Sequence, residues 1–361
     1  MHPTGPPLGR RRVLGLAAAS GLAVATGSTT GAAAAPTGPL DRVPRTLVSR
    51  GSVGPINAPD FPVHHLGLTW TGEDSHGRYR LRRAGRWGSW QPVRPTDAGV
   101  TGRRASLVHV GRADAYQVDL DRGAGDVRVA AINTVDGPPG ATRRPVRRWS
   151  GMPYLSRAAW GADESLRFGP DGSEGLPSEY FDVQTLTVHH TATANADPDP
   201  AATVRAVYAF QALPPQDFGD LGYHLLIDEA GRVYEGRYSG RDWLPVFGGR
   251  SRRGRPQMNN GAHVAGFNAG NVGIALLGEL TDQGPSSAAR RSLVLVLAVL
   301  SRICGLDPRG TTDYMNPISG DTATVPTISG HRDWVATACP GDAFYPRLGV
   351  VRSDVVRLLH R

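Results

Sequence analysis

Apolar and polar residues alternate in the first part of the chain. Around residues 79–82 apolar side chains alternate with basic ones, and Tyr116, Val118 and Leu120 repeat the same spacing. A period of two residues is typical of strands with one buried face, and glycines separate the runs as they do at turns. No segment there has a convincing helical period, so the pattern predicts an all-β accessory domain over residues 36–136.

The pattern changes after residues 137–153, a stretch rich in glycine, proline and arginine that we interpret as a linker. The apolar runs beyond it predict strands at residues 185–190, 223–227, 233–236 and 271–280. Helices are expected after Asp199-Pro200, from Ser286 or Ser287 through Cys304, and around Val351, Val355 and Leu358. Strands and helices without a repeating βαβ unit predict a mixed α/β domain over residues 154–361, with a central mixed β-sheet flanked by helices.

The first 35 residues have the pattern of an export signal. Three arginines at residues 10–12 precede an apolar run at residues 13–25, and alanines fill residues 32–35. The paired arginines favour a twin-arginine signal, and an ordinary secretory signal is the alternative. We therefore expect a secreted or wall-associated protein. No apolar run reaches the roughly 20 residues of a spanning helix, so no transmembrane segment is expected.

Positive charge is concentrated in the first domain. All basic residues are arginines, and residues 36–150 carry 18 of them against 10 acidic residues, whereas acidic residues outnumber arginines after residue 150. A basic domain on an exported protein indicates an anionic wall polymer as a partner, and a solvated basic face without a ligand is the alternative. Nucleic acid is not expected as a partner, since no binding motif is present.

Two histidines and one cysteine could bind a metal. On a strand at residues 185–190, Leu186 and Val188 would enter the core, and His189 would face the other side. His331 and Cys339 lie far downstream, with a loop between them that could surround an ion. Imidazole and thiolate donors favour zinc, and three protein ligands leave a position open for catalysis. The cluster therefore predicts a zinc-dependent hydrolase.

Other interpretations of these residues stay open at this point. Cys304 and Cys339 could form a disulfide in an exported protein. Asp333 could accept a hydrogen bond from a ligand imidazole, or it could be a local cap.

Several short motifs, in order, resemble the peptidoglycan recognition protein and type 2 N-acetylmuramoyl-L-alanine amidase family. They are SRAAWGA at residues 156–162, VHHTA at 188–192, DLGYH at 220–224, VYEGR at 233–237, GAH at 261–263 with Asn268, NVGIA at 271–275, GHRD at 330–333 and CPG at 339–341. The chain is most similar to the secreted actinobacterial branch, and the family includes phage T7 lysozyme.

The resemblance implies roles for individual residues. His189, His331 and Cys339 match the zinc ligands of the family. Tyr223 matches a tyrosine that stabilises the reacting group beside the metal, and Thr337 matches a site residue two positions before the cysteine.

The resemblance also implies a substrate groove, in which we place His190, His263 and Asn268. Glu235 is a candidate general base, although a hydrogen-bonded hairpin residue is the preferred interpretation, and His224 is kept out of the ligand set.

The activity implied is hydrolysis of the amide bond between N-acetylmuramic acid and L-alanine in peptidoglycan. Relatives that lack the cysteine resemble recognition proteins without amidase activity, so a non-catalytic peptidoglycan-binding module is the alternative. Residues 238–260 form an insertion relative to animal members; a flexible lid is one interpretation, and their composition favours a surface loop. Nothing in the sequence requires more than a monomer.

Overall fold

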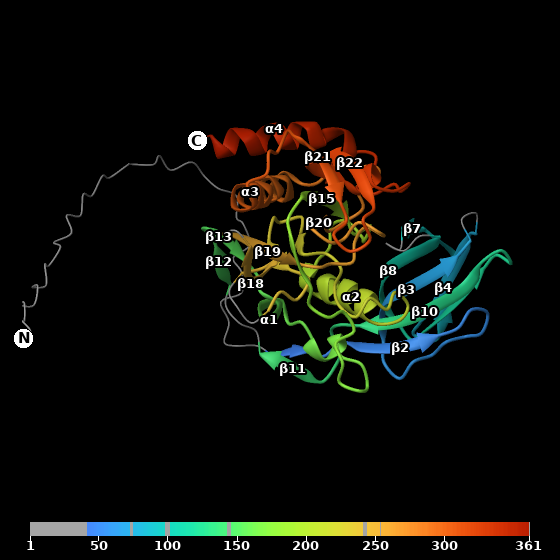
Figure 1. Cartoon of the computed structure of the whole chain (residues 1–361). Helices are drawn as coiled ribbons and strands as arrows, with labels where there is room; N and C mark the ends of the chain where they lie inside the picture. Colours follow the sequence, from blue (N-terminus) through green and yellow to red (C-terminus); the bar gives the residue numbers. More distant parts are fainter. Residues whose placement is uncertain are drawn as a thin grey trace, which may run out of the picture. The chain divides into compact units, whose positions relative to one another are not determined.

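The computed structural model describes residues 42–72, 75–97, 102–142, 146–240, 244–252 and 254–360 (Figure 1). The export signal predicted at residues 1–35 lies outside the described residues. Within the described ranges, no helix is both long and apolar enough to cross a membrane.

The N-terminal region is built from antiparallel strands, which confirms the prediction of a strand-rich region. One sheet has the order β2-β10-β3-β8-β7, with bounds Leu47–Gly51, Gly125–Asn133, Val63–Thr71, Arg103–Ala113 and Thr96–Asp97. In the second sheet β4 (Gly77–Arg83) pairs with β5 (Arg86–Trp87), β6 (Gln91–Val93) and β9 (Ala115–Leu120). Leu66, Trp70, Leu81 and Val118 form part of one buried cluster, so the alternating apolar residues build the core of this region.

The C-terminal region contains a mixed central sheet, as the sequence predicts. Its order is β17-β16-β20-β15-β23, with bounds Val233–Glu235, Leu225–Ile227, Asn271–Leu276, Thr185–His190 and Ile328–Gly330. Only the β16–β17 pair of this sheet is antiparallel. Every residue of β15 and β20 is buried, as is typical of parallel strands that are covered on both faces.

Helices cover both faces of this sheet (Figure 1). On one face, α3 (Ser287–Cys304) and α4 (Leu348–Leu359) pack on Val188 and Ile274. On the other face, α2 (Pro200–Ala212) packs on Leu226 and Ala275. The caps are those that the sequence indicates: Asp199 accepts a hydrogen bond from the backbone N–H of Ala202, Ser286 accepts one from Ala289, and Gly305 ends α3 in the left-handed conformation.

α2 is covered on both sides and joins the two regions. Residues 202–212 are all buried, because the face of α2 that points away from the central sheet meets the first N-terminal sheet. A Cβ atom on Gly67 would lie 2.5 Å from Cδ2 of Phe210, so only glycine allows this close approach. Arg205 adds a hydrogen bond to the carbonyl of Thr134, and Thr69 donates one to the carbonyl of Pro215. The described residues accordingly lie in one compact unit.

Residues 137–153, expected as a linker, contain short strands in the parts that the structure describes. β11 (Pro139–Thr142) pairs with β1 (Arg42–Pro44), and β12 (Arg147–Trp149) forms a hairpin with β13 (Met152–Tyr154). Trp149 and Met152 are buried in the core of the C-terminal region. Gly151 lies at the turn between β12 and β13, whereas Pro139, Gly140 and Pro153 lie within strands.

The insertion at residues 238–260 is more than a surface loop. β18 (Phe247–Arg252) and β19 (Arg255–Asn259) form a hairpin, and β14 (Tyr180–Asp182) adds a third strand. Phe247 and Met258 are buried among the residues that pack under α3. The remaining elements are the short helix α1 (Arg157–Trp160), the 3₁₀ turns Glu164–Arg167, His331–Asp333 and Tyr345–Arg347, and the hairpin of β21 (Thr311–Met315) and β22 (Thr322–Pro326).

Candidate metal centre

The ends of two neighbouring parallel strands bring His189 and His331 together. Leu186 and Val188 of β15 enter the apolar core, so the alternating side chain of His189 lies on the opposite face. β23 runs parallel to β15, and His331 follows directly after it. Strands that are parallel end at the same edge of a sheet, which places the two imidazoles side by side with ring centroids 4.6 Å apart.

The loop after His331 returns Cys339 to the same place. The backbone N–H of Arg332 donates to the carbonyl of Cys339 at 3.1 Å, and the N–H of Cys339 donates to Oγ1 of Thr337 at 3.1 Å. Sγ of Cys339 then lies 3.7 Å from Nδ1 of His189. Cys304 and Cys339 are not joined to each other, so the disulfide considered from the sequence is not formed.

The three potential ligand atoms fit a small tetrahedral metal ion. One atom each from His189, His331 and Cys339 lies within 4.8 Å of the others, and all three residues are buried. Two imidazole nitrogens and one sulfur are donors that suit zinc, and they leave a fourth position for water or substrate. The donor set and its spacing therefore fit a zinc ion of the catalytic type.

His263 fixes which nitrogen of His189 faces this cluster. Nε2 of His263 lies 2.9 Å from the carbonyl oxygen of Asn271, which can only accept, so this nitrogen carries the proton. Nδ1 of a neutral His263 is then an acceptor for Nε2–H of His189, at 3.0 Å. Nδ1 of His189 keeps its lone pair on the side of Cys339. A Cβ on Gly273 would lie 2.6 Å from Cγ of His263, so glycine makes room for this ring.

Burial keeps these imidazoles neutral. Burial, with the neighbouring histidines, lowers the pKa of His189 well below its ordinary value and that of His331 to about 3. The pKa of His263 is lowered to about 4 by burial. Neutral imidazoles are the form that binds metal, so the ligands need lose no proton from nitrogen at neutral pH.

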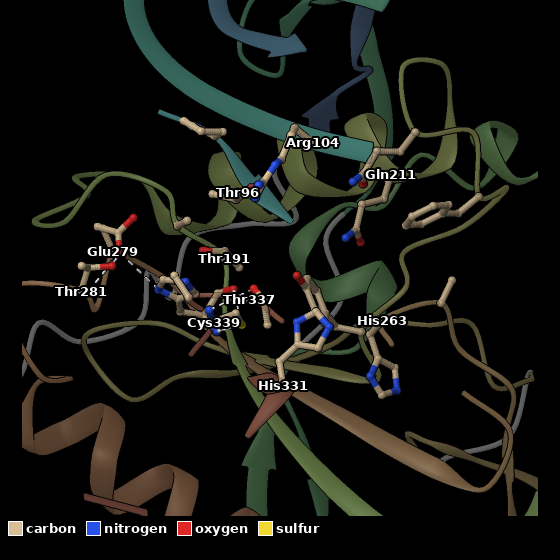
Figure 2. Close-up of a pocket in the computed structure, with 18 residues that line it drawn as sticks. Thr96, Arg104, Thr191, Gln211, His263, Glu279, Thr281, His331, Thr337 and Cys339 are labelled. Carbon is tan, nitrogen blue, oxygen red and sulfur yellow. Dashed lines mark hydrogen bonds and ion pairs between the residues drawn. The ribbon is translucent and has the colours of Figure 1, made fainter. Parts of the chain in front are cut away.

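A cavity of about 120 Å³ opens beside the cluster (Figure 2). Several of the predicted site residues line it, namely His190, Tyr223, His263, His331, Thr337 and Cys339. The ring of Tyr223 lies 5.2 Å from that of His189 between centroids. The structure thus gathers the predicted ligands, Tyr223 and Thr337 around one space large enough for a few heavy atoms beside the metal position.

Asn268 and His190 make contacts that the sequence does not indicate. Oδ1 of Asn268 accepts hydrogen bonds from the backbone N–H groups of His263 and Val264, so this side chain shapes the loop and is not among the lining residues. His190 lines the cavity, but its Nδ1 accepts from the N–H of Leu280 and lies 3.4 Å from Glu279. The loop role of Asn268 follows from its position at a turn, where a side-chain oxygen satisfies nearby backbone donors.

The remaining candidates have structural contacts. Asp333 accepts from the N–H of Gly330 and from the hydroxyl of Tyr345, which supports the cap interpretation. Glu235 accepts from the N–H of Arg157, in agreement with a structural role. Nδ1 of His224 accepts from the N–H of Gly273, and this histidine lies outside the ligand cluster.

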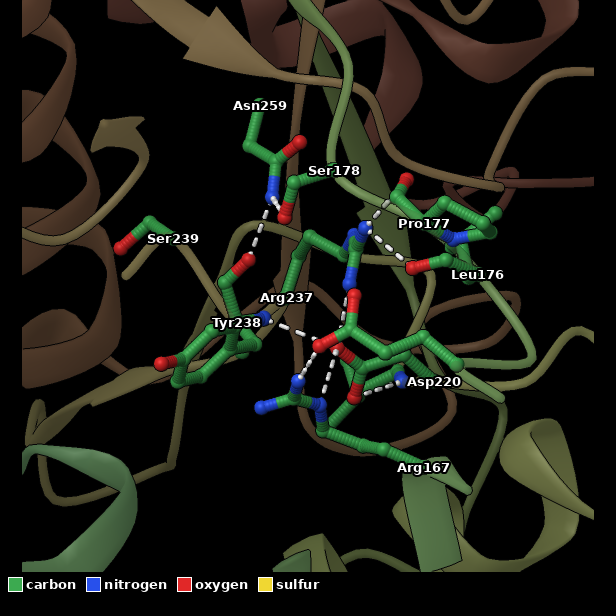
Figure 3. Close-up of polar contacts among 12 residues, drawn as sticks. Arg167, Leu176, Pro177, Ser178, Asp220, Arg237, Tyr238, Ser239 and Asn259 are labelled. Atoms are coloured by element: carbon green, nitrogen blue, oxygen red, sulfur yellow. Dashed lines mark hydrogen bonds and ion pairs between the residues drawn. The ribbon is translucent and has the colours of Figure 1, made fainter. Parts of the chain in front are cut away.

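Asp220, three residues before Tyr223 in the sequence, lies in a buried ion cluster (Figure 3). Asp220 pairs with Arg237 at 2.7 Å and with Arg157 at 3.0 Å, and the side chains of Asp220 and Arg237 are fully buried. Burial opposes ionisation of Asp220, but the two guanidinium groups outweigh it and hold its pKa below the ordinary value. Arg237 also donates to the carbonyls of Leu176 and Asn260. Asp220 and its two arginine partners therefore hold several loops around the cavity.

The sequence motifs contain Asp220 and Arg237 but do not reveal that they pair. Sequence reasoning also missed three lining residues, Pro95, Thr96 and Arg104, which belong to the N-terminal region. Figure 2 shows Thr96 and Arg104 reaching the cavity from the side opposite His331 and Cys339. No local signal marks them, because their place depends on how the first sheet packs on α2.

The chain is similar in sequence to known amidases and peptidoglycan recognition proteins. Residues 179–342 match the family described as N-acetylmuramoyl-L-alanine amidase. A human N-acetylmuramoyl-L-alanine amidase is 30% identical over 171 residues, 45% of this chain and 23% of that protein. A peptidoglycan recognition protein of Trichoplusia ni is 28% identical over 181 residues, 48% of this chain and 79% of that protein.

The chain spans less than a quarter of the human relative's own length, and 19% of the length of a similar amidase from Sus scrofa. Among solved structures, Drosophila peptidoglycan recognition protein SD aligns with 54% of this chain and 92% of its own, at 27% identity and a TM-score of 0.38. An N-acetylmuramoyl-L-alanine amidase, LysC, from Clostridium intestinale aligns with 50% of this chain and 91% of its own, at 20% identity and a TM-score of 0.34.

Proposed function

Because residues 179–342 belong to the N-acetylmuramoyl-L-alanine amidase family, we propose that this protein is a zinc-dependent hydrolase of peptidoglycan. The bond cleaved is the amide between N-acetylmuramic acid and L-alanine. The observation that carries the proposal is the cluster of His189, His331 and Cys339 beside an open cavity. A recognition module needs a groove but no metal-bound water, so three buried donors of the catalytic-zinc type beside the cavity favour the hydrolase.

His189, His331 and Cys339 would hold the zinc ion, with His189 binding through Nδ1. A zinc ion held by three protein ligands lowers the pKa of water to about 7 and polarises a carbonyl group. The protein contributes the orientation of the ligands, since His263 fixes the ring of His189 from behind.

Tyr223 and Thr337 are the groups placed to contact the reacting amide. Tyr223 lines the cavity beside His189, and its phenol hydroxyl is a donor to the negative charge that forms on the carbonyl oxygen. Oγ1 of Thr337 accepts from the N–H of Cys339, which leaves the hydroxyl hydrogen available for the substrate.

The setting of the activity is part of the same proposal. An export signal at residues 1–35 would deliver the enzyme to the cell wall, where it acts as a monomer on peptidoglycan. The exposed arginines of the N-terminal region could bind an anionic wall polymer. The excess of arginines over acidic residues at residues 36–150 supports this.

The test is incubation of purified protein with peptidoglycan, with and without a chelator, followed by mass analysis of the released products. Free stem peptides that begin with L-alanine, lost on chelation and restored by zinc, are expected. New peptide termini with the sugar–peptide bond intact would indicate cleavage inside the stem. Binding without release under every metal condition would contradict the hydrolase and favour the recognition module.

A further inference from the structure

The cavity beside the metal centre has one permanent positive charge among the described residues that line it. That charge is Arg104, on β8 of the N-terminal region. The charge that meets an incoming ligand therefore comes from outside the family-matched residues 179–342.

We propose that Arg104 binds a carboxylate of the peptide part of the substrate, so that the β-rich region forms one wall of the substrate-binding site. This inference rests on the proposed function, since it takes a peptidoglycan stem peptide as the ligand. Stem peptides are acidic, and a planar guanidinium binds a carboxylate through two parallel hydrogen bonds.

The position of Arg104 relative to the metal centre is fixed by the fold. Its backbone pairs with Trp70 of β3 and with Asp97 of β7, so it lies inside the sheet rather than on a loop. The same sheet packs through Gly67 on Phe210 of α2, the helix that lies on the central sheet. A side chain on a rigid element keeps its distance from the reacting groups, as a substrate-positioning residue requires.

Arg104 is also available for a ligand. Among the described side chains, none forms an ion pair with Arg104 within 4.0 Å, whereas the adjacent Arg103 pairs with Asp126. Glu279, the acidic residue of the cavity lining, already accepts from the hydroxyl of Thr281 and lies beside His190. A carboxylate that enters the cavity is therefore attracted by Arg104 and repelled by Glu279. This difference favours one orientation of the bound peptide, with its carboxylate at Arg104.

The experiment compares the full-length wild type, Arg104→Gln and Arg103→Gln. The probes are soluble N-acetylmuramoyl peptides with all carboxylates free, and a series in which one carboxylate at a time is amidated. Steady-state kinetics give kcat and KM, and calorimetric titration gives the affinity without requiring turnover. Arg103→Gln is the matched control, because it removes the same charge from the neighbouring residue, whose guanidinium does not line the cavity.

We expect Arg104→Gln to raise KM and weaken affinity about tenfold or more, the loss typical of a charge-assisted hydrogen bond, with kcat little changed. Amidation of one particular carboxylate should weaken wild-type binding by the same factor and have no further effect on Arg104→Gln. Arg104→Lys should recover part of the affinity, since it keeps the charge without the planar fork.

An affinity of Arg104→Gln equal to that of the wild type, or equal losses on amidation in both proteins, would overturn the assignment. The two proposals fail separately. Carboxylate-dependent binding through Arg104 without peptide release would reject the hydrolase and support the role of Arg104 in binding. Peptide release together with an unchanged affinity of Arg104→Gln would support the hydrolase and reject the role of Arg104.

Discussion

The two five-stranded sheets of the molecule contribute different kinds of side chain to the surroundings of one cavity. The central sheet is mainly parallel and buried on both faces, and the ends of β15 and β23 carry the buried histidines His189 and His331. The N-terminal sheet is antiparallel and packs one face on α2, while its inner strand β8 presents the charged side chain of Arg104 to the cavity. Burial suits groups that bind a metal as neutral ligands, whereas a charge that binds a solvated ligand must stay accessible.

The largest effect on activity is expected from a substitution in the metal-ligand cluster beside the central sheet. Cys339→Ser removes the thiolate donor, so zinc content should fall and peptide release should drop by more than the roughly 100-fold seen when a partner of a metal ligand is lost. Zinc analysis and product analysis on the same samples measure the two quantities. Cys304→Ala is the control, because Cys304 is a buried thiol of α3 away from the cluster. Full activity in Cys339→Ser would remove the cysteine from the ligand set.

Phe210→Ala tests whether the two sheets act as one unit. Phe210 is buried at the contact of α2 with the N-terminal sheet, and truncation of a buried phenylalanine typically costs about 3–5 kcal/mol. We expect hydrogen exchange to increase at β3 and α2 together, and KM to rise because the wall that holds Arg104 moves.

The control for this change is Phe344→Ala, which opens a comparable hole in the core under α3 and α4. It should lower stability and leave KM unchanged. If both variants changed KM equally, the contact between the sheets would have no special role in the site.

A smaller effect on zinc affinity is expected from a substitution of His263, which contacts the ligand His189. His263→Gln breaks the relay that orients His189, which should weaken zinc affinity by about 10–100-fold while the three ligands remain. Competition with a chelator of known affinity measures it. His224→Gln is the matched control, since His224 is equally buried but bonds to Gly273 and Asn259. Equal losses in both variants would assign the effect to packing.

Sequence patterns predict those parts of the site that depend on local rules. The alternation of β15 gives the side of the sheet on which His189 lies, and the caps at Asp199 and Ser286 give the starts of two helices. The order of the motifs brings His331 and Cys339 into the same family pattern. These features are set by residues a few positions apart, so they can be predicted before the fold is known.

Contacts between distant segments could not be predicted. Arg104 lies 227 positions before His331 in the numbering, and only the packing of Gly67 on Phe210 brings them to one cavity. Residues 137–153 have the composition of a linker, yet Trp149 is buried. In both cases the outcome depends on the shape of a surface made elsewhere in the chain, which composition and periodicity do not contain.

The last prediction concerns acid sensitivity of the N-terminal sheet. His65 on β3 is buried, and neither ring nitrogen has a hydrogen-bond partner among the described residues. Burial, with the neighbouring His109 and His64, lowers its pKa from 6.5 to about 3. Between these two values the unfolded chain binds a proton that the folded chain does not. Stability is therefore fully present above pH 6.5 and is lost as pH falls toward about 3.

His65→Phe should remove this dependence, which is at most about 1.4 kcal/mol per pH unit for one group. Denaturant unfolding followed by hydrogen exchange at β3, at several values between pH 7 and pH 4.5, measures the slope. His76→Phe is the control because the His76 side chain is 85% exposed. An unchanged slope in His65→Phe would place the acid sensitivity in the histidines of the central sheet. The central sheet would then determine the lowest pH at which both regions stay folded, although the N-terminal region carries the excess of positive charge.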